Sequence, residues 1–290
     1  MNASGPWVRS LLDQSHLGTN ATPNVKLIKG SHIIVPKLFD GDHACILQQP
    51  DKRIVFAIPY ENDFTLIGTT EENYTGDPYQ AEISNNELNY LLEIVNNNFE
   101  MTVKTSNIIS TYSGVRALYD NNSSDARTTP RTITRDYKLI EDNHSGGNIL
   151  SIFGGKITTY RALAEHAMKF IDTAFQKQTK AWTDKECLIG GDCDPEILID
   201  RIQTNYPALD KSLIERLVYA YGTESLVILR NNHTDFITKT VLKSELDFVC
   251  QHEFVKTGED FLTRRSKLYL HLSQQDQGII SDYIKGITHE

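Results

Sequence analysis

Short apolar runs separated by polar turn residues follow one another through the first part of the chain. A polar segment at 29–32 interrupts the first run, and a turn cluster at 59–63 separates two others. Closely spaced apolar runs joined by turn residues are typical of strands in an antiparallel meander. The pattern therefore predicts a sheet between residues 24 and 70. Its predicted strands are 25–28, 33–35, 45–47, 54–58 and 64–67.

The period then changes from that of strands to that of a helix. Ser84 and Glu87 have the spacing of a capping box, in which hydroxyl and carboxylate each accept a hydrogen bond from a free N–H group. Apolar residues follow at helical spacing, namely Leu88, Leu91, Leu92, Val95 and Phe99. A second amphipathic helix is predicted at 157–175, where apolar residues again fall on one face.

Strand-like runs return between these two helices. They lie at 108–110, 132–139 and 149–153. The polar stretch 141–148 contains two adjacent glycines, so we expect it to connect the last two strands.

From about residue 180 onward the pattern is that of helices only. The predicted helices are 195–206, 211–221, 240–256, 258–271 and 274–286. We therefore expect two domains, 1–179 and 180–290, and an α+β fold class: an antiparallel-sheet domain followed by an all-helical C-terminal domain.

Charge and hydropathy exclude several classes of function. The formal net charge is −9 and no run of Lys and Arg forms a basic patch, so a nucleic-acid-binding protein is not expected. No apolar stretch approaches the roughly 20 residues needed to cross a bilayer, and residues 1–7 lack the pattern of a secretory signal. We expect a cytoplasmic protein, and peripheral contact with a membrane stays open. Amphipathic helices in the C-terminal part are equally explained as helices that face a core.

The four cysteines contain no C-x-x-C pair, and the nine histidines have no ligand spacing. We therefore expect free thiols and no metal site.

Two glycines, Gly154 and Gly155, stand between a predicted strand and a predicted helix. Glycines allow the backbone to approach a ligand closely, and the free N–H groups at a helix start attract an anionic or electron-rich atom. A plain strand-to-helix turn has the same pattern, so the local sequence leaves both interpretations open.

Two arginines and one histidine are further candidates. Arg116 and Arg135 each carry a planar fork of donors that suits phosphate, although either could be a surface ion-pair partner. His32 lies between apolar runs, where it could exchange a proton or be a satisfied core residue.

Several motifs occur in a fixed order that resembles one family. They are N-A-S-G-P-W at 2–7, L-I-K-G-S-H at 27–32, I-P-Y-E-N-D-F-T-L-I-G-T-T at 58–70, Y-S-G-V-R at 112–116, I-T-R-D-Y at 133–137 and F-G-G-K-I-T-T-Y-R at 153–161. Together they resemble the C-terminal part of FAD-dependent glycerol-3-phosphate dehydrogenases. The segment from 259 to 265 is similar to the helical tail domain of that family.

The resemblance implies an activity and partners. Members of the family oxidise sn-glycerol 3-phosphate to dihydroxyacetone phosphate at C2, with FAD as hydride acceptor and a membrane quinone as the next electron acceptor. It also implies that the sheet domain retains part of an FAD-binding domain, and that the protein lies on the inner face of the cytoplasmic membrane.

The resemblance also assigns roles to residues. Arg116 would lie near the reacting hydroxyl and the flavin, Arg135 would bind the phosphate, and His32 would be a pocket histidine that either takes the hydroxyl proton or contacts the phosphate. Two sets of residues would contact FAD. They are Ala3, Ser4 and Gly5 near its dinucleotide part, and Gly154, Gly155, Lys156, Ile157 and Thr158 at its ring, where N–H groups would stabilise negative charge.

The chain departs from the family in two ways. Ser4 stands where the family more often has Thr. No G-x-G-x-x-G motif, which would hold the FAD pyrophosphate, occurs in the sequence. We therefore expect a truncated form that is not competent alone, or an enzyme whose nucleotide-binding half is a separate chain. An oxidase of the same fold that reduces oxygen, or a flavin-free interaction module, are the alternatives.

Overall fold

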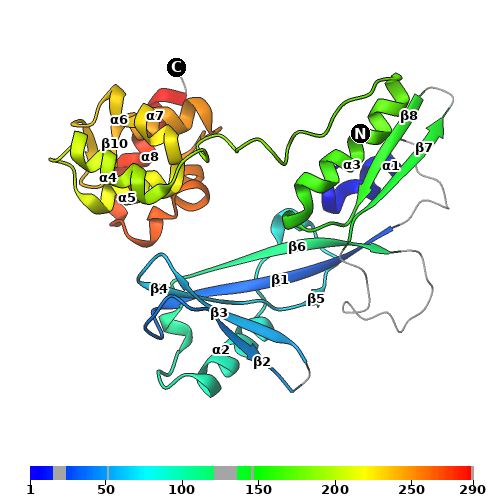
Figure 1. The fold of residues 1–290 in the computed structure, drawn as a ribbon. Helices are drawn as coiled ribbons and strands as arrows, with labels where there is room; N and C mark the ends of the chain where they lie inside the picture. The colour runs from blue at the N-terminus through cyan, green and yellow to red at the C-terminus, as the bar shows by residue number, and fades with distance from the viewer. Residues whose placement is uncertain (16–23, 51, 121–135, 145–146, 289–290) are drawn as a thin grey trace. The chain divides into compact units, whose positions relative to one another are not determined.

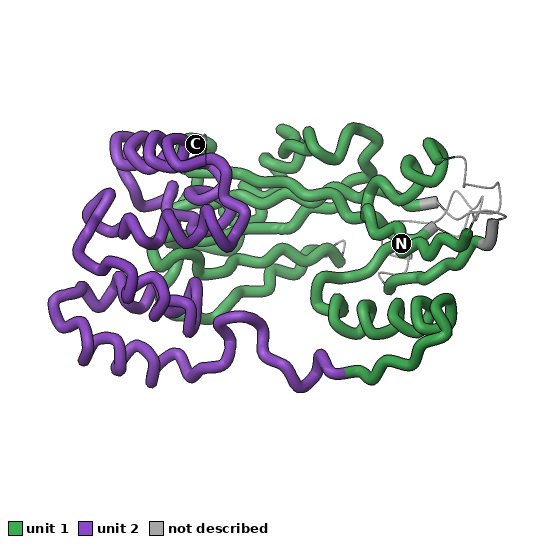
Figure 2. The backbone as a smooth tube through the Cα atoms, turned by 90° about the horizontal axis from the view of Figure 1, so that it is seen from above, with its two compact units in different colours: residues 1–181 green, residues 182–290 purple. Residues whose placement is uncertain are grey.

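The computed structural model describes residues 1–15, 24–50, 52–120, 136–144 and 147–288 (Figure 1). The chain divides into two compact units, residues 1–181 and 182–290 (Figure 2). Each unit is considered by itself below. None of the helices within the described ranges combines the length and the apolar character needed to cross a bilayer.

A six-stranded sheet forms the centre of unit 1. Its strands are β1 (Asn24–Pro36), β2 (Cys45–Gln48), β3 (Ile54–Tyr60), β4 (Phe64–Gly68), β5 (Glu72–Asn73) and β6 (Ser110–Asp120). Every pairing is antiparallel, in the order β2-β3-β4-β1-β5, and β6 also pairs with β1. Figure 1 shows the long strands β1 and β6 side by side. The predicted antiparallel sheet and the α+β class are confirmed.

The predicted break at 29–32 is wrong, because β1 continues through it. Lys29 and Ser31 are buried, 6% and 0% exposed, and both contact the carboxylate of Glu87. Polar side chains are tolerated inside a sheet when they have such partners. Hydropathy alone could not show this, since the partner lies far along the chain. The strand predicted at 108–110 begins only at Ser110.

Helix α2 (Asn85–Asn98) covers one face of this sheet. The predicted capping box between Ser84 and Glu87 is present. The apolar face of α2 packs on alternate residues of the strands, which form one core: Ile33, Val35, Val55, Ile67, Leu91, Leu92, Ile94, Val95 and Val103. The opposite face of the sheet does not contribute to this core.

A hairpin completes unit 1. It consists of β7 (Lys138–His144) and β8 (Gly147–Phe153), so the prediction of 141–148 as a connection is wrong. Polar residues fit here because a two-stranded ribbon leaves much of its surface to solvent. The predicted strand 132–139 lies mostly outside the described residues.

Two helices accompany the hairpin. They are α1 (Val8–Gln14) and α3 (Tyr160–Phe175), the latter preceded by a 3₁₀ turn at Ile157–Thr159. Val8 and Leu12 form a small core with Phe153. The hairpin is thereby fixed to the start of the described chain.

Unit 2 is mainly helical, but it is not all-helical as predicted. Its helices are α4 (Pro195–Asn205), α5 (Lys211–Tyr221), α6 (Ser225–Asn231), α7 (Lys243–His252) and α8 (Gln274–Thr288). A hairpin of β9 (Phe236–Thr238) and β10 (Val241–Leu242) takes up the start of the helix predicted at 240–256. These strands are too short to produce a period-two pattern.

The helix predicted at 258–271 also differs. It is a π-helical turn at Asp260–Arg265 followed by a 3₁₀ turn at Leu268–Leu270. Lys267 between them has φ 57°, a left-handed conformation that ends helical hydrogen bonding.

Candidate functional site

The sheet face opposite α2 carries His32 and Arg116. Residues that face each other across an antiparallel pair project to the same side. The register pairs His32 with Tyr112, Gly30 with Gly114 and Ile28 with Arg116. The histidine and the arginine therefore share one face, with the facing glycines Gly30 and Gly114 between them.

The guanidinium of Arg116 lies over Gly30. A Cβ atom added at Gly30 would be 2.6 Å from Arg116 Nη1 and 2.6 Å from Thr69 Oγ1. Arg116 Nη2 donates a hydrogen bond to Thr69 Oγ1 at 3.3 Å. Only glycine at position 30 allows this placement, which brings the positive charge beside His32.

The imidazole of His32 is held between two neighbours. Its ring stacks on Tyr112, with ring centroids 4.7 Å apart and planes 11° apart. It also covers Gly68, where an added Cβ would be 2.1 Å from His32 Cδ2. Nδ1 is buried and has no hydrogen-bond partner among the residues that the structure describes.

Burial, reinforced by the charge of Arg116, lowers the pKa of His32 to about 4. At neutral pH the ring is therefore uncharged.

The glycine segment before α3 lies against β6. Gly154 and Gly155 have φ values of 71° and 102°, a region that favours glycine. A Cβ atom at Gly154 would be 3.0 Å from the carbonyl oxygen of Asp136 and 3.7 Å from that of Ala117, the residue after Arg116. The β8–α3 turn thus contacts the backbone of β6 at Ala117 and Tyr119.

The start of the following helix is open. Lys156 has an extended backbone, and Ile157 is 86% exposed although it is apolar. The first N–H groups of a helix have no carbonyl in a preceding turn to accept them. Residues Lys156, Ile157 and Thr158 can therefore present backbone donors to a ligand.

The segment at residues 3–5 is fixed by Asn2. The side chain of Asn2 is buried; its Nδ2 donates to Val8 O at 3.0 Å, and its Oδ1 accepts from Ser4 Oγ at 2.6 Å. Asn2 also forms a parallel bridge with Ser151 of β8. Ala3, Ser4 and Gly5 are thus placed beside the strand that leads to Gly154.

Arg135 lies outside the described residues. The next residue, Asp136, is described, and its carbonyl oxygen lies close to Gly154.

Sequence reasoning missed four residues of this site, namely Gly30, Thr69, Gly68 and Tyr112. All four stand within the motifs quoted above, but their roles depend on the strand register. Knowledge that β1 pairs with both β4 and β6 would have placed them beside His32 and Arg116.

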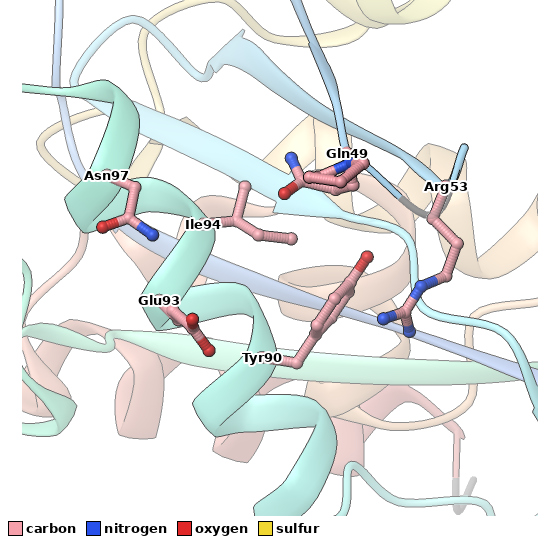
Figure 3. A pocket seen from close by; sticks show the side chains of 7 residues that line it. Gln49, Arg53, Tyr90, Glu93, Ile94 and Asn97 are labelled. Atoms are coloured by element: carbon pink, nitrogen blue, oxygen red, sulfur yellow. The ribbon is translucent and has the colours of Figure 1, made fainter.

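A separate shallow pocket of about 270 Å³ lies between the β2–β3 turn and α2 (Figure 3). The guanidinium carbon of Arg53 is 3.9 Å from the centre of the Tyr90 ring, a cation–π contact. The other lining residues are Gln49, Pro50, Glu93, Ile94 and Asn97. None of the candidate site residues lines this pocket.

Two family models match the chain. Residues 1–161 match the model described as FAD dependent oxidoreductase, and residues 181–286 match that of the C-terminal domain of alpha-glycerophosphate oxidase.

Individual proteins are similar over nearly the whole chain. A glycerol-3-phosphate dehydrogenase of Pseudomonas aeruginosa is 42% identical over 98% of this chain and 56% of its own length. The aerobic glycerol-3-phosphate dehydrogenase of Escherichia coli is 39% identical over 100% of this chain and 58% of its own length. The chain thus spans little more than half the length of these relatives.

The fold is similar to that of a solved structure. The glycerol-3-phosphate dehydrogenase from Bacillus halodurans complexed with FAD superimposes with a TM-score of 0.83, at 23% identity, covering 99% of this chain and 57% of that one. The resemblance inferred from the motifs is confirmed. The first family model covers more than half of the sequence, and the chain therefore belongs to the family of FAD-dependent oxidoreductases.

Proposed function

We propose that this chain provides the substrate side of an FAD-dependent oxidation of sn-glycerol 3-phosphate to dihydroxyacetone phosphate. The observation that carries the proposal is the placement of an uncharged His32 and a charged Arg116 on one face of the sheet. The glycine at 154 lies against the backbone of β6 at Ala117 and Tyr119. The similarity to dehydrogenases named for this substrate supports the same reaction.

The residues fit a flat ring that becomes negatively charged. Gly154 and Gly155 carry no side chain that would keep such a ring away, and the helix start at Lys156–Thr158 offers N–H groups. FAD, when bound, supplies the acceptor for the hydride that leaves C2. Ala3, Ser4 and Gly5 are proposed to contact its dinucleotide part.

His32 is proposed as the general base. A neutral imidazole has a ring nitrogen with a free lone pair, which can accept the proton of the C2 hydroxyl. The depressed pKa of His32 keeps it in that form over the whole neutral range.

Arg116 is proposed to stabilise the negative charge that develops on the C2 oxygen. A guanidinium fixed over Gly30 is already oriented, so no reorganisation is needed during the reaction. Arg135 is proposed to bind the phosphate, as the resemblance implies.

The proposed electron acceptor is a membrane quinone, with the protein on the inner membrane surface. The match of residues 181–286 to a domain of alpha-glycerophosphate oxidase favours oxygen as the second candidate. Parallel assays with a soluble quinone analogue and with oxygen alone distinguish the two.

The experiment that tests the function measures flavin reduction. The G-x-G-x-x-G motif does not occur in these 290 residues, so FAD binding is proposed to need a polypeptide segment that carries it. The chain is mixed with such a segment and FAD, and the loss of oxidised-flavin absorbance is followed after glycerol 3-phosphate is added. We expect reduction that Arg116→Ala abolishes. Reduction that is equally fast in Arg116→Ala contradicts the proposed site.

A further inference from the structure

Behind the site, on the sheet face covered by α2, one carboxylate gathers several donors. Glu87 is 2% exposed. One oxygen, Oε1, accepts hydrogen bonds from Ser31 Oγ at 2.8 Å and from Thr70 Oγ1 at 2.5 Å. The other, Oε2, accepts from the backbone N–H of Ser84 at 2.8 Å and lies 2.8 Å from Lys29 Nζ.

The charge on this carboxylate is retained at neutral pH. Burial by itself would raise the pKa of Glu87, but the hydrogen bonds from Lys29, Ser84 and Thr70 outweigh it and lower that pKa. Lys29 is itself buried and also bonds the carbonyl oxygen of Glu82 at 2.9 Å. A buried ion pair of this kind adds little to stability relative to apolar residues, which leaves its function to be explained.

The two residues bound by Glu87 Oε1 are neighbours of site residues in the sequence: Ser31 precedes His32, and Thr70 follows Thr69. Side chains alternate between the two faces of a strand. Ser31 therefore points to α2 while His32 points to the site. Thr70 is directed to Glu87, whereas its neighbour Thr69 accepts the hydrogen bond of Arg116.

Thr70 also joins the segment after β4 to β1, by two hydrogen bonds with the backbone of Ser31. Its Oγ1 accepts from the N–H of Ser31 at 2.8 Å, and its own N–H donates to the carbonyl oxygen of Ser31 at 3.4 Å. Ser31 Oγ lies 2.8 Å from Ser113 Oγ, next to Tyr112, on which His32 stacks. The carboxylate thus fixes β1, β6 and the residues after β4 at the level of the site.

We propose that Glu87 is a positioning residue that holds His32 and Arg116 in register from the opposite face of the sheet. The inference rests on the proposed function for its catalytic consequence only. Its structural content concerns the relative placement of the imidazole and the guanidinium.

The test compares Glu87→Gln with a control in the same helix. Asn96 lies on α2, and its side-chain amide makes two hydrogen bonds with the backbone of Val103, at 3.0 Å and 2.7 Å. Asn96→Ala therefore loosens α2 without touching Ser31 or Thr70. The readout is the NMR titration of the His32 ring in the full chain, assigned by its loss in His32→Gln.

We expect Glu87→Gln to shift the ring resonances of His32 and to change its titration midpoint, and Asn96→Ala to leave both unchanged. In protein reconstituted with FAD, Glu87→Gln should lower kcat by about 10- to 100-fold with a smaller change in KM, as expected when reacting groups are misplaced. Identical His32 spectra in Glu87→Gln and the unmodified chain would overturn the proposal.

A second variant covers the case in which Glu87→Gln fails to fold because Lys29 loses the carboxylate at 2.8 Å and keeps only Glu72, at 3.6 Å, and the carbonyl oxygen of Glu82. The double variant Lys29→Met with Glu87→Gln removes both charges and retains an acceptor oxygen. The proposal predicts the same displacement of the His32 resonances in the double variant, and unaltered resonances contradict it. If neither the unmodified chain nor any variant reduces flavin, the proposed function is wrong. The NMR comparison still decides whether Glu87 positions His32.

Discussion

At the scale of single residues, the site depends on glycines as much as on charged groups. Gly30 and Gly68 leave space that the Arg116 guanidinium and the His32 ring then fill. The sequence alone identified His32 and Arg116 as candidates, but it could not identify the glycines. Their role follows from cross-strand register, which joins residues that lie far apart in the sequence.

Glycine substitutions should therefore affect the reaction more than the fold. In Gly68→Ala the new methyl group would overlap the His32 ring, and in Gly30→Ala it would overlap Arg116 Nη1 and Thr69 Oγ1. The His32 ring would have to move as a whole, and the methyl group at position 30 would also lie 3.0 Å from the backbone carbonyl oxygen of Thr70, so we expect a stability loss of about 1–3 kcal/mol. We also expect about 100-fold slower flavin reduction.

The matched control is Gly278→Ala on α8, where an added Cβ meets no atom within 4 Å. It should leave the reaction rate unchanged and stabilise unit 2 by about 0.5–1 kcal/mol. Equal rates in Gly68→Ala and Gly278→Ala would show that the placement of His32 is not needed.

Acidification should remove part of the stability of unit 1 through His32. Its pKa is about 4 in the folded chain and 6.5 in the unfolded one, so the unfolded state binds the proton first as the pH falls. The contribution is complete above pH 6.5 and is lost as the pH falls through 4. We expect a loss of about 2 kcal/mol after allowance for partial exposure of the ring.

Urea unfolding at several pH values measures this loss. His32→Gln cannot take up the proton and should lack that part of the pH dependence. If the unfolding free energy of His32→Gln decreases on acidification as much as that of the unmodified chain, His32 is not the source of the decrease.

At the scale of secondary-structure elements, β1 shows most clearly where prediction from the sequence ends. Its apolar residues predicted two strands, whereas Lys29 and Ser31 continue a single strand because Glu87 pairs with the charge of Lys29 and accepts a hydrogen bond from Ser31. The helix that carries Glu87 was predicted correctly together with its capping box. The local sequence pattern thus predicted the helix. It could not predict the continuous strand, which depends on a contact between β1 and a residue far along the chain.

The capping box provides a variant that separates the helix from the site. Ser84 Oγ accepts from the N–H of Glu87 at 3.2 Å, and Ser84→Ala removes this bond. The backbone N–H of Ser84 remains free to donate to Glu87 Oε2. We expect a loss of about 1 kcal/mol in unfolding free energy and unchanged His32 resonances. Displaced His32 resonances in this variant would mean that the site responds to any loosening of α2.

At the scale of the whole molecule, the two units have separate cores. The change to helical periodicity near residue 180 lies close to the division between residues 181 and 182. The core of unit 2 draws on residues from Leu198 to Ile284, whereas the cores of unit 1 lie between Val8 and Phe153. The β9–β10 hairpin was missed since its strands are too short to give a periodic signal.

Separate cores predict that a defect in one unit leaves the other intact. Glu245 is fully buried in unit 2, where it accepts two hydrogen bonds from Arg216, at 2.6 Å and 2.7 Å, and one from Tyr221 at 2.9 Å. Glu245→Ala leaves the Arg216 guanidinium without its carboxylate, which should cost about 3–5 kcal/mol. Differential scanning calorimetry of the full chain should then show one transition shifted to lower temperature and the other unchanged, with His32 resonances unaffected. The two cores share no residue, so only the transition of unit 2 should shift. An equal shift of both transitions would contradict this and would mean that the two units unfold cooperatively.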